Sequence, residues 1–129
     1  MQIKFFMPMI PPTVTHQEHK VMVRKGKPYF YEPAELKAAR SKLLTSVGKH
    51  NPEVPLKGPI RLVTKWIWEK DGQGFEYKTT KPDTDNLIKL LKDCMTKVGF
   101  WEDDAQVASE ITEKFYGDIP GIFVQVETL

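Results

Sequence analysis

Acidic side chains and one lysine gather in a short stretch of the chain, residues 81–107, and their types and spacing suit phosphate chemistry. Asp83 and Asp85 are separated by a single residue, whereas Asp103 and Asp104 are adjacent and come later in the stretch. Residues two apart in an extended segment point to the same side. Asp83 and Asp85 can therefore share one site, and one of Asp103 and Asp104 would join it if the chain returns beside them.

A cluster of carboxylates needs positive charge to stay ionised, because like charges held close together repel one another. Carboxylate oxygens with room for water suit Mg²⁺, or Mn²⁺ as a substitute, and both ions also bind phosphate oxygens. A metal in such a site can polarise a scissile phosphate, activate the attacking water and stabilise the leaving oxygen. The expected reaction is therefore metal-dependent hydrolysis of a phosphodiester.

Lys89 follows Asp85 by four residues, which is about one turn of a helix. Its ammonium group can therefore reach the same site and stabilise negative charge in the transition state. An ordinary surface pair between Asp85 and Lys89 explains the spacing equally well, since such pairs stabilise helices by a few tenths of a kcal/mol. Spacing alone leaves the two interpretations open.

The elements that would hold these side chains are a helix and the strand that follows it. Apolar residues recur at helical spacing after Asp85, and Gly99 is placed to end the helix. Asp83 and its neighbours can cap the helix, which is the structural explanation for one aspartate but does not require two. The acidic run at residues 102–104 has its own plain explanation as a solvated turn before a strand.

The rest of the chain predicts a sheet covered by helices. Strands are expected at residues 3–7 and 60–70, a hairpin at 21–31, a helix from Pro33 to about Gly48, and a terminal hairpin that turns at 118–121. Residues 71–82 are polar and predict a mobile connection that leads to the site. The fold class is therefore α/β (α+β), one small domain over residues 1–129, with a mixed sheet packed by two main helices.

Charge is unevenly distributed along the chain. Residues 1–50 carry a net charge of +6, residues 51–82 carry +2 and residues 83–129 carry −6. A basic first half suits a polyanion, although a mixed surface explains the numbers as well. Candidate DNA contacts are Arg24, Lys25 and Lys27 in a hairpin turn beside aromatic residues, together with Lys81. A solvated hairpin tip is the alternative.

Two further features bound the class of protein. The single cysteine, Cys94, falls among apolar residues at helical spacing, so a buried small side chain is expected in place of a disulfide or a reactive thiol. No apolar run approaches the roughly 20 residues needed to span a bilayer. A soluble cytoplasmic protein with no membrane partner is expected.

The acidic stretch resembles the signature of RusA-like crossover junction endodeoxyribonucleases. The similarity lies in K-P-D-T-D-N-L-x-K at residues 81–89 and G-F-W-E-D-D-A-Q-V at residues 99–107, with the order of elements matching more loosely. The resemblance implies that Asp83, Asp85, Lys89 and Asp104 are catalytic, and that Asp93 supports the fold or the site. Asp103 has a less defined role and is expected to be a further metal ligand beside the three aspartates.

The resemblance also implies a function. Members of that family are small homodimers that bind four-way DNA junctions and use Mg²⁺ or Mn²⁺ to make paired symmetric nicks, and a prophage origin would fit them. We therefore expect a Holliday junction resolvase that acts in recombination and repair. The alternatives are a non-cleaving, structure-selective DNA-binding protein, and a nuclease for flaps or replication forks.

Overall fold

Strands and helices follow the apolar patterns of the sequence in the computed structural model, which describes residues 1–13, 20–24, 26–31, 33–70 and 74–129. The strands are β1 (Gln2–Pro8), β2 (Lys20–Arg24), β3 (Lys27–Tyr31), β4 (Ile60–Glu69), β5 (Glu76–Tyr77), β6 (Val107–Gly117) and β7 (Gly121–Thr128). The helices are α1 (Ala34–Val47), α2 (Thr84–Lys97) and the short 3₁₀ helix η1 (Asp104–Gln106).

Five of the strands form one mixed sheet in the order β1-β7-β4-β6-β5, while β2 and β3 pair with each other as the predicted hairpin. The central strand, β4, pairs antiparallel with β7 and parallel with β6. The predicted terminal hairpin is therefore wrong in its pairing although its two strands exist. Strand β4 lies between β6 and β7, and its residues alternate between buried and half-buried positions up to the exposed Glu69, as suits the middle of a sheet.

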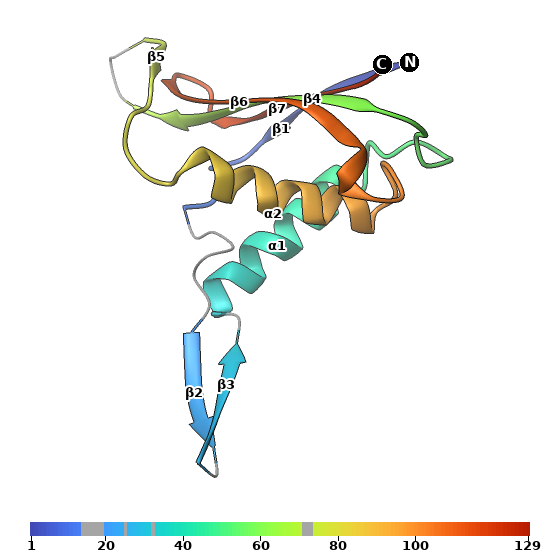
Figure 1. Ribbon diagram of the computed structural model, residues 1–129. Coiled ribbons are helices and arrows are strands. Elements are labelled where there is room, and N and C mark those ends of the chain that lie inside the picture. Colours follow the sequence, from blue (N-terminus) through green and yellow to red (C-terminus); the bar gives the residue numbers. More distant parts are fainter. Residues whose placement is uncertain (14–19, 25, 32, 71–73) are drawn as a thin grey trace.

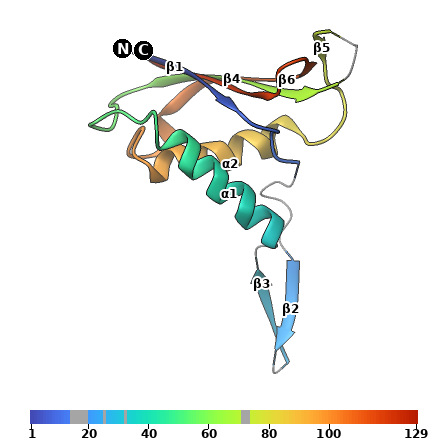
Figure 2. The same ribbon diagram turned by 180° about the vertical axis from the view of Figure 1, so that it is seen from behind.

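Both main helices lie on the same face of the five-stranded sheet (Figure 1), and the opposite view confirms this arrangement (Figure 2). The core lies between the helices and this inner face, and it includes Leu62 and Trp66 from β4. The one buried polar side chain among the described residues, Thr64, accepts a hydrogen bond of 2.9 Å from Trp66 Nε1. The predicted fold class, a mixed sheet packed by two helices, is confirmed.

Helix α2 provides most of the helical contribution to the core. Its buried side chains are Leu87, Ile88, Leu90, Leu91, Cys94 and Met95. Cys94 is fully buried, as its sequence context predicts. Gly99 follows the helix with a φ of +89°, a left-handed conformation that glycine adopts without strain, so the predicted end of the helix is confirmed.

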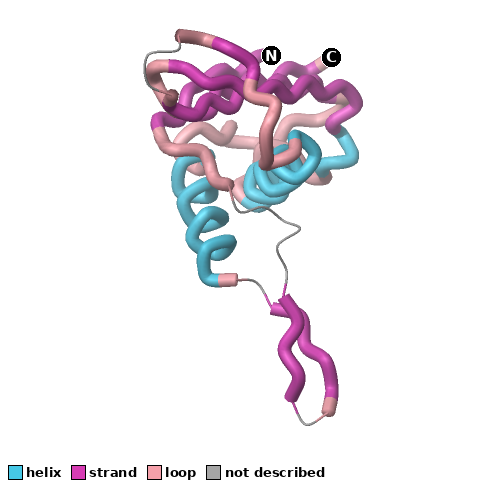
Figure 3. Tube along the Cα trace, turned by 90° about the vertical axis from the view of Figure 1, so that its left-hand side faces the viewer, coloured by secondary structure: helices cyan, strands magenta, loops and turns pink. Residues whose placement is uncertain are grey.

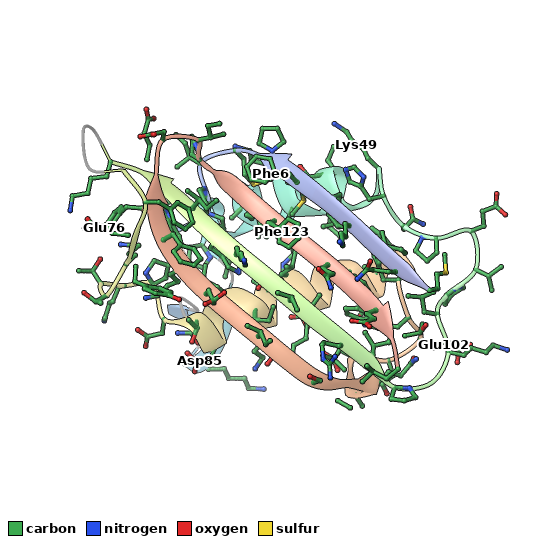
Figure 4. All side chains as sticks on the ribbon, turned by 90° about the horizontal axis from the view of Figure 1, so that it is seen from above. Phe6, Lys49, Glu76, Asp85, Glu102 and Phe123 are labelled. Atoms are coloured by element: carbon green, nitrogen blue, oxygen red, sulfur yellow. The ribbon has the colours of Figure 1, made fainter. Side chains whose placement is uncertain are left out.

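The other face of the sheet is not covered by any described helix, and Figure 4 looks onto it. Phe6 and Phe123 pack here across the β1–β7 pair. Lys65 also belongs to this face, with its ammonium group 6.0 Å from the centroid of the Phe123 ring. The β2–β3 hairpin stands apart from the sheet, beyond the beginning of α1 (Figure 3). No helix within the described residues is long and apolar enough to cross a membrane.

The two chain ends lie side by side at one edge of the sheet. Gln2 pairs with Glu127, and the amino group of Met1 donates a hydrogen bond of 2.8 Å to Thr128 Oγ1. Strand β1 forms this edge, whereas β6 and the short β5 form the opposite one. The N-terminal strand β1 is therefore separated from β6 by β7 and β4.

Close approach of β1 and β7 makes Gly121 the position most sensitive to an added methyl group. A Cβ there would overlap the Phe6 ring and lie 2.7 Å from the carbonyl oxygen of Met7. We expect Gly121→Ala to lower the free energy of unfolding by roughly 1–3 kcal/mol, because overpacking forces the strands apart. The shift in the urea midpoint measures this loss.

Gln125→Ala is the matched control for that variant, because Gln125 lies in the same strand and also faces away from the core. Its free energy of unfolding should stay within about 0.5 kcal/mol of the wild type. A Gly121→Ala protein with the wild-type midpoint would contradict the close approach of the two strands.

Candidate active site

Asp83 and Asp85 lie at the beginning of α2, and both are exposed. Asp83 occupies the N-cap position in an extended conformation, yet its side chain makes no capping hydrogen bond. Asp85 is in the first turn and forms no ion pair with another described residue. Neither carboxylate therefore caps the helix, and both are available to a ligand.

Lys114 of β6 fixes the segment that leads into these aspartates. Its ammonium group donates hydrogen bonds to the carbonyl oxygens of Thr80, at 2.7 Å, and Pro82, at 2.8 Å. The carbonyl oxygen of Lys114 accepts a third bond, of 2.9 Å, from the backbone N–H of Lys78. Side chain and backbone of one residue thus anchor the connection immediately before Asp83.

The second acidic motif, residues 99–107, has structural roles for most of its members. Trp101 is buried and donates from Nε1 to Thr96 Oγ1 at 2.7 Å. Asp103 caps η1 by accepting a 2.9 Å hydrogen bond from the backbone N–H of Ala105. Gln106 completes the capping box and donates to the carbonyl oxygens of Leu56 and Gly58. Asp104 remains exposed and forms no ion pair with the described residues.

Helix α2 separates Asp104 from the other two aspartates. Its 14 residues span about 20 Å, with Asp83 and Asp85 at its beginning and Asp104 beyond its end. Figure 4 places Asp85 and Glu102, two residues before Asp104, at opposite ends of this helix. The expectation that the three aspartates form one cluster is thus not met within a single chain.

Metal binding by one chain is limited accordingly. Among the described residues, no group of three or more His, Cys, Asp or Glu side chains could hold a metal ion. The pair Asp83 and Asp85 can still provide the protein ligands of a Mg²⁺ ion, because Mg²⁺ often binds only one or two protein carboxylates. Its other coordination positions are then filled by water and substrate phosphates. This pair is the donor set that the described chain offers at one place. Asp103 is committed to its cap, and Asp104 belongs to the other end of α2.

Lys89 and Asp93 occupy later turns of α2. Lys89 is exposed and forms no ion pair with Asp85, so the ordinary surface pair that its spacing allowed does not form among the described residues. Asp93 lies 4.0 Å from the guanidinium group of Arg40 in α1. Asp93 therefore joins the two helices, in line with a supporting role in the fold.

The predicted DNA-contacting residues are spread over two places. Arg24 ends β2 and pairs in register with Lys27, which begins β3 and is exposed, whereas Lys25 lies outside the described residues. Lys81 is exposed in the segment before Asp83. Strands β2 and β3 lie beyond the beginning of α1 and away from both ends of α2 (Figures 1 and 2).

Sequence reasoning missed a cluster of cationic and aromatic side chains beside Asp83. Lys78 donates from Nζ to the Tyr116 hydroxyl at 3.2 Å and to Thr80 Oγ1, and its ammonium group lies 5.4 Å from the centroid of the Trp68 ring. Hydrogen bonding from Thr80 and from Lys78 lowers the pKa of Tyr116 below its ordinary value. A signal was present in the sequence, because Thr112, Lys114 and Tyr116 put polar groups on the inner face of β6.

Two tyrosines on opposite faces of the sheet should ionise in a defined order. The pKa of Tyr77 is raised because its hydroxyl is hydrogen-bonded to the carboxylate of Glu113, at 3.1 Å, whereas that of Tyr116 is lowered. Phenolate absorbance measured against pH checks this order. The ionisation step that Tyr116→Phe removes should occur at a lower pH than the step that Tyr77→Phe removes. The reverse order would contradict the two hydrogen-bond arrangements.

Comparisons with known proteins show the family of this chain. The model of the family described as "Endodeoxyribonuclease RusA" matches residues 9–127. The uncharacterized protein YqaN of Bacillus subtilis (strain 168) is 29% identical over 117 residues, which cover 81% of this chain and 82% of YqaN. The crossover junction endodeoxyribonuclease rusA of Lactococcus phage r1t is 28% identical over 111 residues, covering 83% of each chain. With a match that spans both acidic motifs and leaves out only β1 of the five strands of the sheet, the chain belongs to the RusA endodeoxyribonuclease family.

Proposed function

We propose that the protein is a Mg²⁺-dependent endonuclease that resolves four-way DNA junctions by paired symmetric nicks. One observation carries the proposal. Asp83, Asp85 and Asp104 are exposed and have no ionic partner among the described residues, whereas Asp103 in the same stretch is held by its cap. Solvent-exposed carboxylates without a structural role are the groups that a family of nucleases has available for its chemistry.

Asp83 and Asp85 would hold the Mg²⁺ ion, with Mn²⁺ as a substitute, and a phosphate of the DNA would complete the coordination. When bound, the ion supplies charge that polarises the scissile phosphate and lowers the pKa of the attacking water. Lys89, exposed on the same helix, contributes a point charge where the phosphate becomes more negative. Lys114 keeps the segment before Asp83 in place through its two carbonyl contacts.

A homodimer would supply the third aspartate. Between Ser109 and Glu113, β6 pairs with β4 on one side and with no described strand on the other. A second copy that adds antiparallel to this free edge would be related by a twofold axis. The axis would exchange the two ends of α2, so Asp104 of the partner subunit would approach Asp83 and Asp85. Two equal sites would follow, as paired nicks require.

Loss of any one of these aspartates should stop cleavage. We expect Asp83→Asn, Asp85→Asn and Asp104→Asn each to slow nicking of a labelled four-way junction by more than about a hundredfold, since even the groups that merely support metal ligands contribute 10–100-fold. Junction binding should persist, because each change removes negative charge that faces phosphate. Gel analysis of cleavage in Mg²⁺, Mn²⁺ and EDTA, beside a binding assay, measures both.

Asp118→Asn is the control for these variants, because Asp118 is an exposed acid in the turn between β6 and β7. The Asp118→Asn protein should cleave the junction like the wild type. Full cleavage by Asp83→Asn or Asp104→Asn would contradict the site assignment. A wild-type protein that binds the junction but never cuts it would instead support a structure-selective DNA-binding protein. Cutting of flaps or forks in preference to four-way junctions would change the substrate and leave the site intact.

The composite site makes a separate prediction about mixed dimers. A dimer with one Asp83→Asn chain and one Asp104→Asn chain would hold one site with both changes and one site with all three aspartates. We therefore expect this mixed dimer, co-expressed and purified through a different tag on each chain, to nick one strand of the junction. Each parent variant alone should be inactive, and an inactive mixed dimer would show that the site does not combine two chains.

A further inference from the structure

Two ammonium groups converge on one aromatic ring beside the proposed active site. Lys70 Nζ and Lys78 Nζ lie 4.8 Å and 4.9 Å from the centroid of the Tyr116 ring. Lys70 is neutralised by Glu76, whose carboxylate is 2.8 Å away. Lys78 has no carboxylate partner among the described residues, although its side chain is only half exposed. One positive charge in this cluster therefore lacks a counter-charge.

Part of the hydrogen-bonding capacity of Lys78 is also unused. A lysine ammonium has three N–H donors, and the contacts of Lys78 to Tyr116 and Thr80 use two of them. Trp68, whose ring lies below the same ammonium group, is 7% exposed, and its buried Nε1 has no hydrogen-bond partner in the described structure. The remaining ammonium donor of Lys78, combined with its uncompensated positive charge, suits an anion with several oxygens.

The cluster lies close to the proposed catalytic carboxylates. Thr80 bonds Lys78 and precedes Asp83 by three residues, which can span at most about 10 Å. Tyr116 and Lys114 are two residues apart on the same face of β6, and Lys114 holds the carbonyl oxygens of Thr80 and Pro82. Phosphates of one DNA strand advance by about 3.4 Å along the helix axis. A phosphate within a few nucleotides of the cut would thus reach the cluster.

We propose that Lys78, held over Trp68 and Tyr116, binds a DNA phosphate that flanks the scissile one. The inference rests on the proposed nuclease function and adds a second contact point on the cleaved strand. Its effect is to align that strand, so that the scissile phosphate meets Asp83 and Asp85. The lowered pKa of Tyr116 supports the choice of an anion, because it reports a local environment that favours negative charge at the Tyr116 hydroxyl.

The salt dependence of junction binding tests this contact. Each phosphate contact contributes about 0.9 to the slope of log K against log salt concentration on B-form DNA. Measured without metal, so that no cleavage occurs, Lys78→Met should flatten the slope by about 0.9, whereas Lys78→Arg should keep it. Methionine retains an unbranched apolar side chain to cover Trp68, so the comparison isolates the charge.

Lys65→Met is the matched control, because Lys65 also lies over an aromatic ring but on the opposite face of the sheet. It should leave the slope unchanged. An unchanged slope for Lys78→Met, or an equal change for Lys65→Met, would overturn the inference. A cleavage assay distinguishes the phosphate contact from the proposed function. If the wild type cuts junctions but Lys78→Met binds with the wild-type slope, only the phosphate contact is refuted. If the wild type never cuts, the proposed function is refuted.

Discussion

The parallel pairing of β4 with β6 is the constraint on which the arrangement of the acidic residues depends. Two parallel strands must be joined by a crossover, because the chain has to return to the starting edge of the sheet before it can run in the same direction again. Here β5, α2 and η1 make that crossover. Whatever precedes α2 therefore lies at the carboxyl ends of β4 and β6, and whatever follows α2 lies at their beginning.

This topology gives the two motifs different surroundings. The carboxyl ends of parallel strands are the usual place for ligands in α/β proteins, and Asp83, Asp85, Lys78 and Tyr116 gather there. At the other end, Gln106 and Asp103 are occupied with holding η1 and the loop around Leu56. Packing of α2 against the sheet keeps the ends apart, since its buried side chains fix the helix along its whole length.

The sequence predicts the elements better than their partners. Apolar spacing reveals α2 and β4 because a half-buried helix or strand repeats its environment with a fixed period. It does not say which strand lies next to which, so β6 and β7 look like a hairpin although β4 separates them.

The same limit explains which parts of the site the sequence could predict. Spacing finds Asp83 and Asp85, but the contact of Lys78 with Tyr116 arises only because the chain at Tyr77 and Lys78 runs beside β6. The distance between Asp104 and Asp83 likewise follows from the crossover, which no local pattern encodes.

The neighbouring chain ends have a practical consequence for protein engineering. Because Met1 and Thr128 are hydrogen-bonded to each other, a short linker could join the termini and new ends could be opened elsewhere, as in circular permutation. Both ends lie on the β1 side of the sheet, at the same end as η1, because Thr128 pairs with Ile60 of β4 and Ile60 pairs with Val107 of β6. Fluorophores or surface tethers attached at the N-terminus would therefore stand on the opposite edge of the sheet from the free β6 edge proposed for a second subunit, which suits labelling of the dimer.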